Sequence, residues 1–200
     1  MTEKKSDIDD FQHLLSVISH ERFLNKQGLG NEVPFFIYPY NAEKAFAVND
    51  LRRRLTNRLE LLGIKVLDIN LYDLSVEIIK ERGIWEQLIE RENTISKGQF
   101  KELLQSVLDS EAYLIPAIAK KLQNSEFAVL FLSGVGEVFP YIRSHNVLNN
   151  LQSTAKEKPT LMFYPGKYEY SPEMGAALRL FGRIPGDKYY RAFNIFHYEV

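Results

Sequence analysis

The sequence predicts an α/β fold, a three-layer sandwich with helices on both faces of a mainly parallel, five-stranded sheet. Short apolar runs typical of buried strands recur along the chain. Between them lie longer stretches with the apolar period of amphipathic helices. No repeat, low-complexity tract or linker divides the chain, so we expect one domain over residues 1–200.

A helix and a buried strand are expected first. Ser6 or Asp7 can cap backbone amides at the start of a helix, and apolar residues follow at helical spacing. Gly28 and Gly30 are expected to end this segment. The run VPFFIYPY, residues 33–40, is typical of a strand that is buried on both faces.

The residues after the first predicted strand indicate a helix and a second strand, and thus a strand–helix–strand unit. A helix with leucines along one face is expected over residues 42–62, and Gly63 ends it. The run IKVLDINL, residues 64–71, predicts a second strand. Because a helix joins these two strands, we expect them to lie parallel, with a right-handed crossover.

The middle of the chain is predicted to be helical. Helical spacing occurs in several segments between residues 73 and 122, and Pro116 is expected to interrupt or kink the last of them. The block is too long for a plain crossover between two strands. We therefore predict a helical insertion over about 73–122 that covers one end of the sheet.

Three strands are predicted in the remainder. The apolar runs FAVLFL, residues 127–132, and TLMFY, residues 160–164, indicate two of them, and the second is expected to end at a Pro-Gly pair. A short helix is expected near residues 172–181. The last strand is expected over residues 189–197.

Composition excludes several kinds of protein. The chain has 25 Lys+Arg against 26 Asp+Glu, so no general attraction to nucleic acid or acidic lipid follows. It has no cysteine, which excludes disulfides, thiolate nucleophiles and zinc–thiolate sites. No apolar run approaches the roughly 20 residues of a membrane span. The opening MTEKKSDIDDFQ is not a secretory signal, so we expect a cytoplasmic protein without a membrane segment.

The turn after the third predicted strand is a candidate ligand site. Gly134 and Gly136 let backbone amides approach a ligand at the end of a parallel strand. Arg143, with His145 beside it, is expected about one turn inside the next helix, where it could face an anion. The alternative is structural: the glycines form a tight turn and Pro140 starts the helix. The spacing is not GxGxxG, which favours this alternative.

Known catalytic patterns are missing from the sequence. The phosphate-binding pattern GxxxxGK[ST] does not occur, and residues 38–45 hold no glycine where that loop would lie. The four histidines lack the spacing of a metal site, and no GxSxG elbow is present. We expect a protein that is not an enzyme and that uses no cofactor.

Basic residues form two groups in the sequence. The first, Arg52, Arg53, Arg54 and Arg58, lies opposite the leucines of the second predicted helix. Such a group is typical of a solvated face with ion pairs, so direct DNA binding is not favoured. The second group mixes aromatic and basic residues, as protein interfaces and single-stranded nucleic-acid sites both do. It consists of Lys167, Tyr168, Tyr170, Arg179, Arg183, Tyr189, Tyr190 and Arg191.

Four segments of the C-terminal third resemble the hallmark motifs of the BrxB family and occur in that family's order. They are FLSGVGEVFPYIRSHNVLNNL (131–151), PTLMFYPGKY (159–168), LRLFGR (178–183) and YYRAF (189–193). BrxB proteins are small components of bacteriophage exclusion (BREX) defence systems, which distinguish host from phage DNA with an adenine methyltransferase. The chain length and the strand at 33–40 fit the resemblance as well.

The resemblance implies a non-enzymatic component that binds the phosphatase-like protein PglZ. Other BREX components, the methyltransferase among them, are further candidate partners. The family resemblance also implies that the fold is a degenerate relative of P-loop or RecA-like folds, which agrees with the missing phosphate-binding loop. An alternative is a sensor that binds a nucleotide or phosphate through the glycine loop and nearby arginines. The candidate contact residues are Gly134, Gly136, Arg143, His145, Lys167, Tyr168, Arg179, Arg183 and Arg191.

Overall fold

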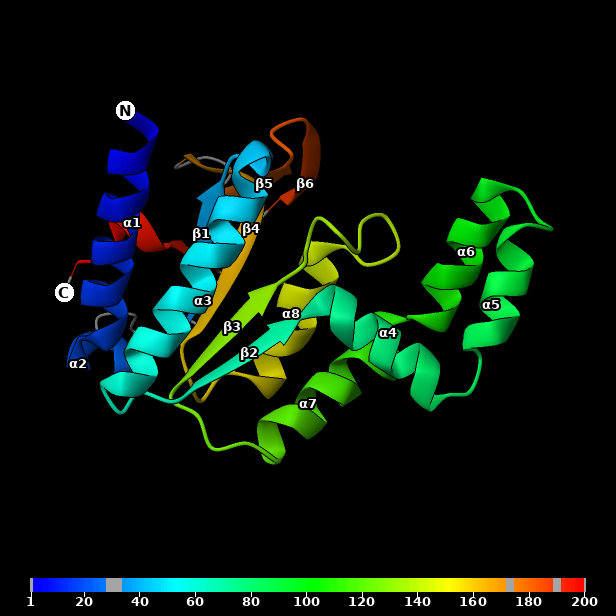
Figure 1. Ribbon diagram of the computed structural model, residues 1–200, viewed down its shortest axis with the longest axis horizontal. Helices are drawn as coiled ribbons and strands as arrows, with labels where there is room; N and C mark the ends of the chain where they lie inside the picture. The colour runs from blue at the N-terminus through cyan, green and yellow to red at the C-terminus, as the bar shows by residue number, and fades with distance from the viewer. Residues whose placement is uncertain (1, 28–33, 172–174, 189–191, 200) are drawn as a thin grey trace.

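A parallel sheet of five strands lies at the centre of the molecule (Figure 1), which a computed structural model describes over residues 2–27, 34–171, 175–188 and 192–199. Across the sheet the order is β2 (Val66–Asn70), β3 (Val129–Ser133), β4 (Thr160–Ser171), β1 (Phe35–Tyr40) and β7 (Phe193–Asn194). Each neighbouring pair in this order is parallel. The predicted α/β class with a mainly parallel sheet is confirmed.

Helices cover both faces of this sheet (Figure 1). One face carries α1 (Thr2–Ser19) and α3 (Ala45–Leu61), and the other carries α4 (Leu71–Glu81), α7 (Ile115–Gln123) and α8 (Ser144–Thr154). Side chains of β1 alternate between the two cores: Phe36 and Tyr38 pack toward α1 and α3, whereas Phe35 and Ile37 pack toward the opposite helices. Because both faces are buried, the strand reads as a continuous apolar run.

The first helix differs in length from its prediction. It spans Thr2–Ser19, so it begins before Ser6 and ends well before the expected glycines, because a second short helix, α2 (Glu21–Leu24), follows directly. The side chain of His20 caps α2 by accepting from the Arg22 amide at 3.1 Å. Gly28 and Gly30 lie outside the described residues. Ahead of α3, the 3₁₀ turn η1 (Ala42–Lys44) follows β1.

The helical middle is built differently from its prediction at one point. The expected long helix is divided into α6 (Lys97–Val107), a π-helical segment η2 (Ser110–Leu114) and α7. Asp109 starts η2, since its carboxylate accepts from two backbone amides at 2.8 and 3.1 Å. The π-helical segment runs directly into α7, and Pro116 lies in the first turn of α7, where the helix changes from π to α geometry.

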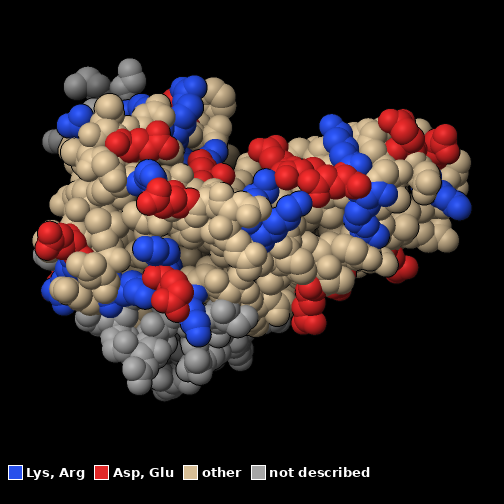
Figure 2. Space-filling model, turned by 90° about the horizontal axis from the view of Figure 1, so that it is seen from below, with Lys and Arg blue, Asp and Glu red and all other residues tan. Residues whose placement is uncertain are grey.

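The insertion lies only partly over the sheet. Its first and last helices, α4 and α7, contribute to the buried core against the sheet. By contrast, α5 (Trp85–Glu92) and α6 project from the sheet as a pair of helices (Figure 1). On the face of the molecule shown in Figure 2, acidic and basic side chains are interspersed over these two helices and over the rest of the described surface. That face has no continuous basic patch among its described residues.

The C-terminal quarter contains an antiparallel extension that replaces the predicted short helix. β4 runs past Pro165 to Ser171 and pairs antiparallel with β5 (Gly175–Leu180), which pairs with β6 (Ile184–Lys188). The prediction of a helix near 172–181 was wrong because pairing with β4 outweighs local helix propensity. Pro165 lies opposite Tyr40, the last residue of β1, so it stands where β4 exchanges β1 for β5 as its partner.

The predicted last strand is also shorter. Within residues 189–197 the described part contains β7 and the 3₁₀ turn η3 (Ile195–His197), and residues 189–191 lie outside it.

Candidate functional site

The segment after β3 is a loop rather than the start of a helix. Residues 134–143 are irregular, and α8 begins only at Ser144. Arg143 is therefore the residue before the helix and not one turn inside it, and Pro140 does not start the helix. The loop also contributes three apolar side chains to the buried core. These buried side chains are Val135, Val138 and Ile142.

The two glycines of this loop make close contacts with the protein itself. Gly134 has a φ of +78°, and a side chain there would collide with Asn70. A Cβ at Gly136 would lie 2.9 Å from Pro165 Cγ and 3.0 Å from Phe181 Cε1. The glycines thus let the loop pack closely on the end of β2 and on the antiparallel extension.

Arg143 and His145 line a cavity of about 180 Å³ between the loop and the extension. Leu180 and Ile184 line its other side. Arg143 itself is exposed, and His145 is half-buried. The structure therefore brings these two predicted residues next to β5 and β6, which lie far from them in sequence.

Basic side chains gather on the extension next to this loop. Lys167 of β4 lies opposite Arg179 of β5, and Arg183 lies in the turn that follows β5. All three are exposed. Arg179 Nε donates to a carboxylate oxygen of Glu169 at 2.9 Å. We call the exposed residues of this region, Arg143, Lys167, Arg179, Phe181 and Arg183, together the hairpin surface.

Two predicted residues are not part of the hairpin surface. Tyr168 is half-buried on the opposite side of β4, and its hydroxyl donates to the Ala192 carbonyl at 3.0 Å. Burial raises the pKa of Tyr168 above its ordinary value. Arg191 lies outside the described residues.

A crevice of about 320 Å³ opens at the carboxyl ends of the central strands. The last residue of each of three strands lines it: Tyr40 of β1, Asn70 of β2 and Ser133 of β3. Further lining side chains come from α3 and from the loop after β3, namely Phe46, Asn49, Arg52 and Glu137. Gly134, a predicted candidate residue, also lines this crevice, whereas none of the seven residues named above was predicted to bind a ligand. The signal that could have found the first three is their position directly at the end of an apolar run.

An ion pair borders this crevice. Arg52 forms an ion pair with Asp68 and donates from Nη2 to Asn49 Oδ1 at 2.7 Å. Its side chain is only 14% exposed, so Arg52 does not belong to the solvated face predicted for the arginine group. Burial raises the pKa of Asp68, and the neighbouring Arg52 offsets part of this effect. Burial, with Glu137 nearby, raises the pKa of Tyr40 to about 12.

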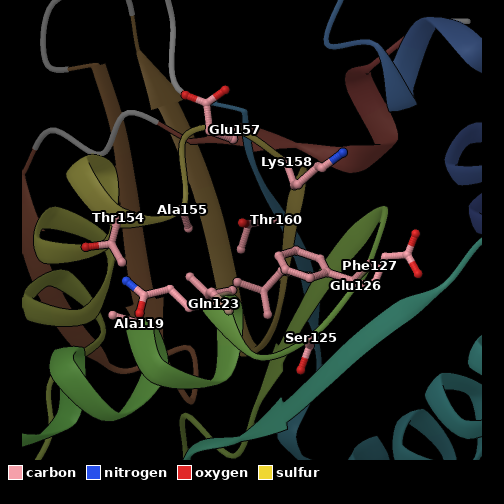
Figure 3. Close-up of a pocket in the computed structure, with 12 residues that line it drawn as sticks. Ala119, Gln123, Ser125, Glu126, Phe127, Thr154, Ala155, Glu157, Lys158 and Thr160 are labelled. Carbon is pink, nitrogen blue, oxygen red and sulfur yellow. The ribbon is translucent and has the colours of Figure 1, made fainter.

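A second cavity, of about 420 Å³, lies at the opposite end of the sheet (Figure 3). It is enclosed by α7, by the segment between α8 and β4, and by the first residues of β3 and β4. Thr160, at the start of β4, is 1% exposed, and its hydroxyl has no hydrogen-bond partner among the described residues. Glu126, Glu157 and Lys158 supply the charged groups of its lining (Figure 3). No predicted site residue lies here.

Neither a metal-binding cluster nor a membrane-spanning helix occurs in the described part of the chain. It holds no group of three or more His, Asp or Glu residues placed to bind a metal ion. No helix within the described ranges is both long and apolar enough to cross a bilayer.

Comparison with known proteins places the chain in a family. The family model "BREX protein BrxB" matches residues 67–195, which include the loop after β3 and the antiparallel extension. The chain belongs to the BrxB family. The expected resemblance is therefore confirmed, and membership makes the chain a component of a BREX system with a role in phage defence.

Two BrxB relatives match nearly the whole chain. The BREX protein BrxB of Bacillus cereus (strain H3081.97) is 32% identical over 189 residues, which cover 91% of this chain and 93% of that protein. The BREX protein BrxB of Escherichia coli O9:H4 (strain HS) is 30% identical over 180 residues, covering 90% and 86%. No solved structure matches the chain.

Proposed function

We propose that this BrxB-family protein acts in phage defence as a non-enzymatic interaction module whose hairpin surface binds a PglZ-type BREX component. One observation carries the proposal. Two segments that resemble BrxB motifs, residues 131–151 with the loop after β3 and residues 178–183 with the turn after β5, are distant in sequence but pack against each other through Gly136 and Phe181. Arg143, Phe181 and Arg183 of these two segments are exposed.

The chemistry of the hairpin surface supports a protein partner. Phe181 is 39% exposed, and arginines precede and follow it in sequence. Aromatic and arginine side chains are enriched at protein interfaces and often carry most of the binding energy. Glu169 pairs with Arg179, but Arg143, Lys167 and Arg183 still give the named residues of this region an excess of positive charge, so a complementary partner surface would be acidic.

The packing of the glycine loop supports the same proposal. Gly134 and Gly136 approach Asn70, Pro165 and Phe181, so their lack of a side chain serves the contact between the loop and the extension. A loop held in this way presents Arg143 from a fixed backbone. This is the preorganisation that a binding surface needs.

The sensor alternative and the proposed fold kinship draw on other features. A nucleotide- or phosphate-binding sensor would use the glycine loop, whose close contacts to protein atoms give that alternative less support.

We propose in addition that the fold is a degenerate relative of P-loop or RecA-like folds. The interior position of β1, followed at once by η1 and α3, supports this kinship.

Co-elution tests the proposed function. This protein and the PglZ protein of the same system are mixed and separated by size exclusion with light scattering. We expect a stoichiometric complex, and the double variant Arg143→Glu, Arg183→Glu should bind PglZ at least about tenfold more weakly, as buried interface arginines do. Phage resistance should fall in parallel.

A charge-matched variant controls this experiment. Arg53→Glu, Arg58→Glu carries the same charge change on exposed positions of α3, away from the hairpin surface. It should bind PglZ like the wild type. Separate peaks at micromolar concentration would reject PglZ binding, and wild-type binding by the folded Arg143, Arg183 variant would place the contact elsewhere.

A further inference from the structure

The crevice at the carboxyl ends of β1, β2 and β3 has the position of a ligand site. From β1 the chain leads into α3 on one face of the sheet, and from β3 it leads into α8 on the other face. In open parallel sheets, ligands bind where successive connections diverge in this way. The volume of about 320 Å³ is in the range of small-molecule sites.

Ser133 supplies an independent observation. It is the last residue of β3, lines the crevice and is only 7% exposed. Its Oγ has no hydrogen-bond partner among the described residues. A buried hydroxyl without a partner lowers stability, so such groups in folded proteins call for an explanation. A ligand atom in the crevice would satisfy it.

The crevice combines an apolar side with hydrogen-bonding groups. Phe46 lines it and is 90% exposed, which leaves its ring free to stack on a ligand. Asn70 Oδ1 accepts from the backbone amides of Tyr72 and Asp73, and Asn49 Oδ1 accepts from Arg52. The amide nitrogens of the two asparagines therefore remain as donors beside the Ser133 hydroxyl.

The charges around the crevice disfavour a polyphosphate. Arg52 already pairs with Asp68, and Glu137 adds a second carboxylate at the crevice itself. An anionic ligand would thus meet two carboxylates against one engaged guanidinium. An uncharged ligand with a flat apolar face and hydrogen-bond acceptors along its edge fits these groups better.

We propose that this crevice binds the base of a nucleoside, with Phe46 stacked on its face and with Ser133, Asn49 and Asn70 hydrogen-bonded to its edge. Tyr40, which also lines the crevice, carries a phenol hydroxyl that is a further donor to the same edge. This site does not overlap the hairpin surface and does not depend on PglZ binding.

Binding of nucleosides to the full chain tests the proposal. Adenosine, guanosine, cytidine and uridine are each titrated by isothermal calorimetry and by thermal unfolding, with ATP as the anionic comparison. We expect at least one nucleoside to bind saturably and to raise Tm, since binding to the native state alone stabilises it. Phe46→Ala and Ser133→Ala should each weaken binding at least about tenfold, the ratio expected when a stacking contact or a hydrogen bond is lost.

The chain offers a matched control for the serine. Thr160 also carries a buried hydroxyl without a partner among the described residues, but in the cavity at the other end of the sheet (Figure 3). Thr160→Val should leave nucleoside binding unchanged. Phe46→Ala should keep the Tm of the free protein, because its ring is almost fully exposed.

Several outcomes would overturn the proposal. These are no binding of any nucleoside, wild-type affinity in both Phe46→Ala and Ser133→Ala, loss of binding in Thr160→Val instead, or tighter binding of ATP than of every nucleoside. The last result would support the phosphate-sensor alternative. PglZ co-elution is measured without nucleoside, so its failure and the failure of this proposal are distinguishable.

Discussion

Phe139 meets Phe181 edge to face, with ring centroids 6.4 Å apart and ring planes inclined at 88°. Phe139 lies in the loop after β3, and Phe181 lies in the turn after β5. The contact therefore joins two segments that resemble BrxB motifs and holds the turn with its Arg183 beside the loop with its Arg143.

We expect the two rings to be energetically coupled. Phe139→Ala and Phe181→Ala should each lower the free energy of unfolding. The loss in the double variant should be about 1 kcal/mol smaller than the sum of the two single losses, because edge-to-face pairs contribute roughly 0.5–1.5 kcal/mol beyond their burial. Urea unfolding of the four proteins measures this coupling. Strict additivity would show that the rings do not stabilise each other.

Gly136→Ala should destabilise the protein by about 1–3 kcal/mol, the usual cost of overpacking. A Cβ there would lie 2.9 Å from Pro165 Cγ and 3.0 Å from Phe181 Cε1, so the loop or the extension would have to shift. Gly98→Ala is the control, because only Ser96 Oγ lies within 4 Å of its Cβ position and it occupies the first turn of α6. Thermal unfolding should show Gly98→Ala equal to or more stable than the wild type, and equal loss in both variants would contradict the steric argument.

Tyr168→Phe should lower stability by about 0.5–1.5 kcal/mol, the net contribution of one hydrogen bond, since its hydroxyl donates to the Ala192 carbonyl. It should leave PglZ binding unchanged, because the side chain packs within the fold. Denaturation and co-elution on the same protein separate the two effects. A variant of normal stability that fails to bind PglZ would make Tyr168 a contact residue instead.

Asp68 should make stability depend on pH. Its pKa is raised in the folded protein, chiefly by burial, so the folded state holds this proton more tightly than the unfolded chain does. The resulting contribution is complete below the unfolded value of about 3.9 and is lost as pH rises through the folded pKa. Relative to Asp68→Asn, the wild type should therefore lose stability as pH rises from about 4. A difference in unfolding free energy that stays constant over this range would contradict the raised pKa.

Local patterns were sufficient wherever burial follows a simple period. The strand at 35–40 and the leucine face of α3 were predicted from apolar residues alone, because a strand buried on both faces and an amphipathic helix each leave a characteristic spacing. The ends of elements were less well predicted. Asp109 sets the start of η2 by capping it, and β4 continues beyond Pro165 because it pairs with β5. Neither contact can be recognised from the spacing of apolar residues.

The candidate site shows the same division. The sequence marked Gly134, Gly136 and Arg143 as a distinctive turn, but it placed Arg143 inside a helix, whereas α8 begins only at Ser144. Arg52 was assigned to a solvated face, whereas Asp68 on the neighbouring strand holds it at the rim of a crevice.

Residue spacing and motifs along the chain were sufficient to predict the α/β class, the family and most of the helices and parallel strands. Three features could be seen only in the folded protein: residues 175–180 form a strand, the loop after β3 meets the turn after β5, and three strand ends share one crevice. Each of these depends on strand pairing or packing between residues distant in sequence, and the free energy of such contacts exceeds the local preference of either partner.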